Sequence, residues 1–119
     1  MSLILNIETS TKVCSVALSQ NGECINLIEK SDQQYQHNEN LFPFIESVFK
    51  GAEFELKDLS AVAISKGPGS YTGLRIGTSA AKGLCHGLNI PLIGIDTLES
   101  LARLCEASAD FICPMLDAR

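Results

Sequence analysis

The chain has 119 residues, of which 45% are hydrophobic and 19% charged, and its formal net charge is −5. Length and composition indicate one folded domain and exclude an intrinsically disordered chain. The acidic balance argues against a basic face that grips nucleic acid, so contact with RNA is expected to be indirect. The sequence predicts neither a membrane span nor a secretory signal.

The five cysteines are an odd number and include no C-x-x-C pair. They lie among apolar residues, which favours small buried side chains over disulfides or metal ligands. Because free thiols persist in reducing compartments, we expect a cytoplasmic protein.

The first half of the chain predicts an antiparallel meander followed by a helix. Apolar runs with β-branched members cover residues 3–8, 13–18 and 24–28, and Asn21-Gly22 is a strong hairpin signal. The four residues between the first two runs are too few for a helical crossover. Apolar residues then recur at helical spacing over residues 41–49.

The second half predicts strands over residues 59–65 and 91–95, with a helix over 74–88 between them. Two helical crossovers then join parallel strands. Asp96 or Thr97 is expected to cap a third helix over 98–105. We therefore predict an α/β fold in which three antiparallel strands are extended by two parallel ones, with helices on both faces.

The domain is expected to cover residues 1–108. Residues 109–119 resemble the beginning of a further strand. They are interpreted as the start of a second lobe that is missing from this chain.

A glycine-rich loop, Gly67-Pro68-Gly69-Ser70, joins the predicted strand 59–65 to the helix after it. Ser70 or Thr72 can cap that helix, whose first N–H groups can hold a phosphate. The loop lacks the Gly-Lys-Ser/Thr of a Walker A site and the third glycine of the dinucleotide fingerprint. Phosphate binding and a purely structural turn both remain open.

Glu8, Thr9 and Ser10 close the first predicted strand. A carboxylate followed by hydroxyl residues is the layout of actin-like ATPases and sugar kinases, although Glu replaces Asp here and no glycine follows. Glu8, Thr9 and Ser10, with Gly67 and Gly69 of the loop, are the candidate phosphate-binding residues. Hydroxyl residues also populate ordinary tight turns.

No catalytic constellation is found in the sequence. The two histidines, His37 and His86, fall on different predicted helices, and neither has a second ligand at metal-binding spacing. His37 is expected to be exposed or to cap its helix. We therefore expect no catalytic residue, metal or cofactor.

Three segments together resemble the TsaB (YeaZ) family: residues 4–10 (ILNIETS), 67–77 (GPGSYTGLRIG) and 114–119 (PMLDAR). The resemblance implies an actin-like, ribonuclease H-like fold with two lobes, of which this chain is the first. It also implies a non-catalytic role in the bacterial synthesis of threonylcarbamoyladenosine in tRNA. The implied partners are the catalytic paralogue TsaD and the ATPase TsaE, with tRNA contacted only indirectly.

The catalytic paralogue carries an H-x-x-x-H metal pair just after the strand that corresponds to residues 91–95. Here residues 96–101 read DTLESL, without histidine. The resemblance therefore implies a subunit that is not an enzyme. The alternatives are a phosphate- or nucleotide-binding enzyme of the sugar-kinase type and a glycoprotease-like peptidase, which would lack its metal ligands.

In the resembling family the first two helices pair with those of the paralogue. The helix over 41–49 also has a wider apolar face than packing on one sheet requires, which indicates either deep packing or a partner surface. Small residues on the second helix recur at i, i+4, i+8, where another helix, or the chain's own sheet, can approach closely. The predicted interface, for TsaD or for a homodimer, comprises Leu41, Phe42, Ile45, Phe49, Gly73, Gly77 and Ala81.

Overall fold

The computed structural model describes residues 1–31 and 37–117. They form a five-stranded sheet with strand order β3-β2-β1-β4-β5. The strands are β1 (Leu3–Glu8), β2 (Val13–Gln20), β3 (Glu23–Ser31), β4 (Ala61–Gly67) and β5 (Leu92–Asp96). β1, β2 and β3 pair antiparallel, whereas β4 lies parallel to β1 and β5. The predicted mixed sheet is confirmed.

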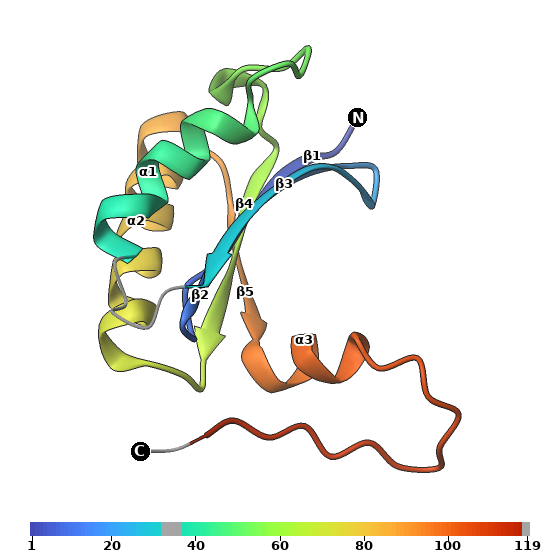
Figure 1. Ribbon diagram of the computed structural model, residues 1–119. Helices are drawn as coiled ribbons and strands as arrows, with labels where there is room; N and C mark the ends of the chain where they lie inside the picture. Colours follow the sequence, from blue (N-terminus) through green and yellow to red (C-terminus); the bar gives the residue numbers. More distant parts are fainter. Residues whose placement is uncertain (32–36, 118–119) are drawn as a thin grey trace.

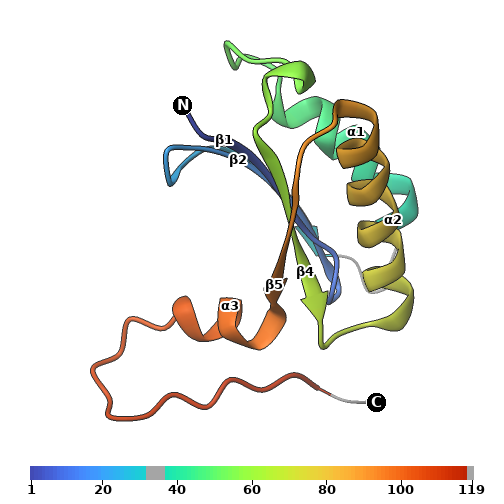
Figure 2. The same ribbon diagram turned by 180° about the vertical axis from the view of Figure 1, so that it is seen from behind.

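Helices lie on both sides of this sheet, as predicted. α1 (His37–Val48) and α2 (Tyr71–Leu88) cover one face, and α3 (Thr97–Arg103) lies on the opposite side (Figures 1 and 2). A single 3-10 turn, Leu56–Asp58, precedes β4. α1 and α2 begin earlier than their apolar patterns, since the first turn of each contains polar residues.

The core lies between the sheet and the α1/α2 layer. Alternate residues of β1 are buried, because successive side chains of a strand point to opposite faces. Leu3, Leu5 and Ile7 belong to one apolar cluster with Leu41 and Ile45 of α1. Fully burying one such side chain stabilises the fold by roughly 1.5–3 kcal/mol.

Turns and helix caps follow the residue types that the sequence supplies. Asn21 and Gly22 both have positive φ, which confirms the predicted hairpin turn. The Ser70 hydroxyl accepts a hydrogen bond from the Gly73 N–H, and Asp96 accepts from the N–H groups of Leu98 and Glu99. Satisfying unpaired N–H groups in this way fixes where α2 and α3 begin.

The prediction of buried cysteines is correct only in part. Cys14 and Cys85 are buried, and burial raises the pKa of both thiols. Cys24, Cys105 and Cys113 are exposed, because they lie on the edge strand β3 or after α3. Among the described helices, none has the length and hydrophobicity needed to cross a membrane.

Candidate partner-binding site

The polar residues of the turn between β1 and β2 form hydrogen bonds with one another and with β4. One oxygen of the Glu8 carboxylate accepts hydrogen bonds from the Ser10 N–H, at 2.9 Å, and from the Ser10 hydroxyl. The other oxygen accepts from the hydroxyl of Ser65 on β4. Thr9 and Ser10 are only 1% and 2% exposed. Both oxygens of the acid that the sequence singled out therefore bind neighbouring hydroxyl residues.

The same turn also holds the start of α2. The Thr9 hydroxyl donates to the Gly73 carbonyl at 2.6 Å, and the Ser70 N–H donates to the Ser10 carbonyl at 2.7 Å. Gly69 lies so close that a Cβ there would stand 2.6 Å from the Ser10 carbonyl oxygen. The glycine loop and the β1–β2 turn therefore fix each other by direct contact.

These contacts support the structural interpretation of the candidate phosphate residues. The hydroxyls of Thr9 and Ser10 already donate within the chain. Gly67 has φ of +119°, which favours glycine whether or not a ligand is bound. A cavity of about 1020 Å³ does lie beside the loop, and among the described residues of its wall Lys12 is the only basic one. Phosphate binding stays a prediction that these bonds do not favour.

The small-residue stripe of α2 faces the chain's own sheet. A Cβ on Gly73 would collide with the Thr9 carbonyl, and one on Gly77 would collide with the Thr9 hydroxyl and lie 3.2 Å from Ile64. Ala81 is fully buried. Gly73, Gly77 and Ala81 are thus removed from the predicted partner interface, because the close approach that they permit is to β1 and β4.

The predicted interface residues of α1 divide into two groups. Leu41 and Ile45 are buried in the core; burial argues against Ile45 as part of the partner surface, whereas Leu41 also lines the groove between α1 and α2. Phe42 is 54% exposed, and Phe49 packs only partly against the core. The difference arises because Phe42 lies on the flank of α1, away from the sheet-facing stripe, whereas Phe49 lies in the turn that follows the last residue of the helix.

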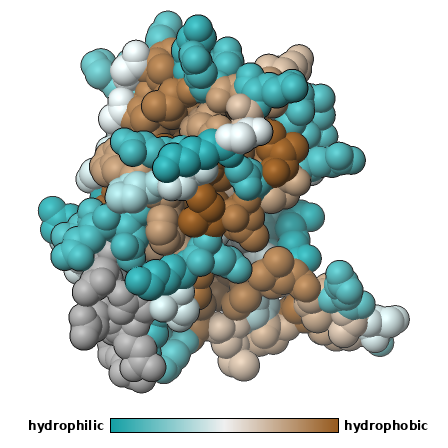
Figure 3. All heavy atoms as spheres, turned by 45° about the horizontal axis from the view of Figure 1, so that its top comes forward, coloured by the Kyte–Doolittle hydropathy of each residue, from teal (hydrophilic) through white to brown (hydrophobic). Residues whose placement is uncertain are grey.

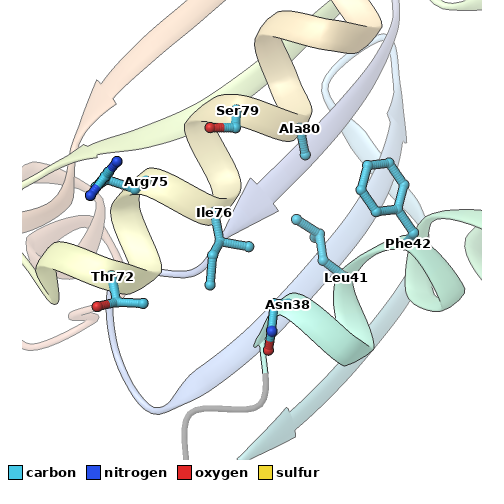
Figure 4. A pocket seen from close by; sticks show the side chains of 8 residues that line it. All are labelled: Asn38, Leu41, Phe42, Thr72, Arg75, Ile76, Ser79 and Ala80. Atoms are coloured by element: carbon cyan, nitrogen blue, oxygen red, sulfur yellow. The ribbon is translucent and has the colours of Figure 1, made fainter.

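A groove of about 520 Å³ separates α1 from α2. In Figure 4, Leu41 and Ile76 point toward each other across it, whereas the Arg75 side chain points away from α1. Hydrophobic residues also reach the face shown in Figure 3, between rows of hydrophilic side chains. The groove is lined by Asn38, Leu41, Phe42, Thr72, Arg75, Ile76, Ser79 and Ala80.

Sequence reasoning missed the α2 wall of this groove. Thr72, Ile76 and Ala80 recur at i, i+4, i+8. Each lies one position before a member of the predicted small-residue stripe, Gly73, Gly77 and Ala81. Arg75, at the rim, donates to the Tyr71 hydroxyl at 3.3 Å and lies 5.2 Å from the centre of its ring. The available signal was helical periodicity, which puts residues four apart, such as Ile76 and Ala80, on one face of α2.

His37 is fully buried, so the prediction of an exposed or capping histidine is wrong. Its Nε2 lies 2.5 Å from the Thr11 carbonyl oxygen. The contact ties the start of α1 to the turn that also holds α2. The β1–β2 turn therefore sets the positions of both helices that border the groove.

The described residues contain no group of three potential metal ligands. Asp96, which begins the segment where the paralogue is expected to carry its metal pair, caps α3 through two backbone N–H groups. The candidate site taken further is the groove between α1 and α2, whose wall combines Leu41, Phe42, Ile76 and Ala80 with polar residues.

Comparison with known proteins gives concordant matches. The family model of TsaD, tRNA N6-adenosine threonylcarbamoyltransferase, matches residues 29–119. The tRNA threonylcarbamoyladenosine biosynthesis protein TsaB of Escherichia coli K12 is 37% identical over 84% of this chain and 42% of its own length. A tRNA N6-adenosine threonylcarbamoyltransferase of Christiangramia forsetii is 36% identical over 82% of this chain and 32% of its own.

The fold matches a solved structure described as YeaZ from Pseudomonas aeruginosa. The TM-score is 0.81 at 32% identity, over 87% of this chain and 48% of that one. The chain spans about half the length of the TsaB relatives that it matches. It belongs to the TsaD family that the model describes, and within that family to the TsaB (YeaZ) proteins.

Proposed function

We propose that this chain acts as the first lobe of a non-catalytic subunit in the synthesis of threonylcarbamoyladenosine in tRNA. Its role is to bind the catalytic paralogue TsaD, with the ATPase TsaE joining the pair. The names of the TsaB relatives support the process, and the unmatched half of those relatives leaves room for the second lobe.

The observation that carries the proposal is the uncovered groove between α1 and α2. Phe42 exposes more than half of its surface in the wall of the groove, which also includes the partly buried Ile76. Aromatic and arginine side chains supply a large share of the binding energy at protein interfaces, and Phe42 and Arg75 are residues of these types. A helical partner that covered the groove would bury Phe42.

The bonds around Glu8 support a binding role over an enzymatic one. Its carboxylate oxygens already accept three hydrogen bonds from Ser10 and Ser65, so a metal ion would compete with these groups for Glu8. The second candidate function, a phosphate- or nucleotide-binding enzyme, rests on the 1020 Å³ cavity beside the glycine loop. Nucleotide titration separates the two.

The experiment measures the affinity of purified TsaD-type paralogue for this chain and for two variants. Phe42→Ala should weaken binding about tenfold or more, which is the loss typical of an interface anchor. Leu27→Ala on β3 is the matched control, because Leu27 is 51% exposed and lies outside the groove. Equal affinity of both variants for the paralogue, at the wild-type value, would exclude this groove as the docking site.

A further inference from the structure

The two edge strands of the sheet, β3 and β5, differ in the charges that they carry. Among the described residues each pairs with one neighbouring strand, β2 or β4. β3 carries three exposed charged side chains, those of Glu23, Glu29 and Lys30. Charged side chains on an edge strand hinder its pairing with a further strand. The β3 edge is therefore protected against another chain.

β5 lacks this protection. Its sequence, LIGID, contains one charged residue, Asp96, and the carboxylate of Asp96 caps α3. The three large apolar side chains of the strand, Leu92, Ile93 and Ile95, are 36–39% exposed. Figure 2 shows β5 on the near side of the sheet, with α2 to its right and α3 to its left. An exposed apolar edge without guarding charges is a site at which another strand can pair.

The backbone of β5 offers hydrogen-bonding groups at this edge. The Val62 N–H donates to the Pro91 carbonyl at 3.1 Å, so the Pro91 carbonyl points toward β4. Successive residues of a strand turn their backbone groups to opposite sides, so Ile93 also bonds toward β4. Leu92 and Gly94 therefore turn their N–H and C=O groups to the outer edge. These groups can accept and donate hydrogen bonds to one more strand.

We infer that β5 pairs antiparallel with β5 of a second copy of this chain, about a two-fold axis that passes by Gly94. In this register the Gly94 residues of the two copies exchange both of their backbone hydrogen bonds, and Leu92 of each copy pairs with Asp96 of the other. Ile93 of one copy then lies directly opposite Ile95 of the other, so each exposed isoleucine gains apolar contact. The two sheets become one continuous sheet.

The sequence of β5 favours a second copy over an unrelated strand. The register centred on Gly94 overlaps the whole of Leu92–Asp96, and it places no like charges opposite each other, because Asp96 faces Leu92. The pairing uses the free β5 edge of both copies, so it closes as an isologous dimer. α2 packs mainly against β4, inward of this edge, so the axis perpendicular to the sheet brings edge to edge without stacking the helices.

This inference goes beyond the proposed function, because it concerns the β5 edge and leaves the α1/α2 groove open. The two are also tested by different substitutions. Loss of paralogue binding in Phe42→Ala, with no pairing at β5, leaves the proposed function intact and overturns the inference. Pairing at β5, with paralogue binding insensitive to Phe42→Ala, supports the inference and excludes the groove as the docking site.

Two substitutions at Gly94 isolate its outward N–H group. Gly94→Pro removes this N–H, which is not bonded to β4, and proline is tolerated on an edge strand where the N–H faces solvent. Gly94→Ala is the matched control, because it adds a Cβ beside the flexible end of the Lys66 side chain but keeps the N–H. Ile93→Lys is a second variant, which places a lysine opposite Ile95 without changing the backbone. Circular dichroism checks that each variant folds.

Amide hydrogen exchange, followed by NMR in dilute solution and at about 1 mM, measures the pairing directly. In the wild type the N–H groups of Leu92 and Gly94 should exchange at least about twofold more slowly at the higher concentration, which corresponds to half of the edges paired at a Kd of about 1 mM. The N–H of Ile93, which is bonded to β4, should not change. Gly94→Ala should behave as the wild type.

In Gly94→Pro and in Ile93→Lys, the Leu92 N–H should exchange at the same rate at both concentrations. Because exchange is read at β5 itself, association through any other surface does not imitate the result. Exchange of Leu92 and Gly94 that is independent of concentration in the wild type overturns the inference. Protection of Leu92 that persists in Ile93→Lys also overturns it, as does protection that appears only when the TsaD-type paralogue is added.

Discussion

Replacing Gly77 with alanine tests how closely α2 lies against β1. A Cβ at this position collides with the Thr9 hydroxyl and stands 3.2 Å from Ile64. Both neighbours are buried, so neither can move into solvent. We expect Gly77→Ala to destabilise the chain, although alanine is the better helix former.

The expected loss can be worked from opposing contributions. Helix propensity favours alanine by about 0.5–1 kcal/mol. Overpacking costs roughly 1–3 kcal/mol. Displacing Thr9 also weakens its hydrogen bond to the Gly73 carbonyl, worth about 0.5–1.5 kcal/mol. The net destabilisation is therefore about 0.5–4 kcal/mol, with a central value of about 2 kcal/mol.

Gly83→Ala is the matched control on the same helix. A Cβ at Gly83 meets nothing within 4 Å, so alanine there should stabilise the fold by about 0.5–1 kcal/mol. Urea titration and thermal melts measure the difference, at about 4 °C in Tm per kcal/mol for a chain of this size. If Gly77→Ala proves as stable as Gly83→Ala, the close packing of α2 on the β1–β2 turn is refuted.

Three further predictions concern thiols, nucleotide and metal. With a thiol reagent at neutral pH, the exposed Cys24, Cys105 and Cys113 should react quickly. Cys14 and Cys85 should react only on unfolding, because burial shields both thiols and raises their pKa. Rapid reaction of all five cysteines would contradict the core packing. Calorimetry should detect no tight binding of ATP, since Glu8, Thr9 and Ser10 already have internal partners; a micromolar Kd, about −8 kcal/mol, would contradict this. Treatment with a chelator should leave Tm unchanged, and a stoichiometric metal whose removal lowers Tm would count against a subunit without metal.

Much of the fold was predictable from local patterns. Asn21-Gly22 indicated the hairpin, the apolar runs marked the strands, and Ser70 and Asp96 cap the helices that follow them. Each of these features depends on residues adjacent in sequence. The parallel placement of β4 and β5 followed from the two helical crossovers.

The sides of the helices that face solvent were harder to predict. Periodicity showed that Gly73, Gly77 and Ala81 share one stripe of α2, but it did not tell whether that stripe faces the sheet or a partner. The answer depends on the approach of Thr9, which is distant in sequence. The burial of His37 was not predictable for the same reason, because the side chain contacts the carbonyl of Thr11, which is distant in sequence.

The hydrogen bonds of the β1–β2 turn explain how a glycine-rich loop that resembles a phosphate site can satisfy its backbone donors without phosphate. Backbone N–H groups at a helix start need acceptors, and phosphate is one common acceptor. Here the Ser10 carbonyl accepts from the Ser70 N–H, and the Ser70 hydroxyl accepts from the Gly73 N–H. Two of the donors thus find acceptors inside the chain. The same bonds fix the start of α2, and the contact of His37 with the Thr11 carbonyl ties the start of α1 to the same turn.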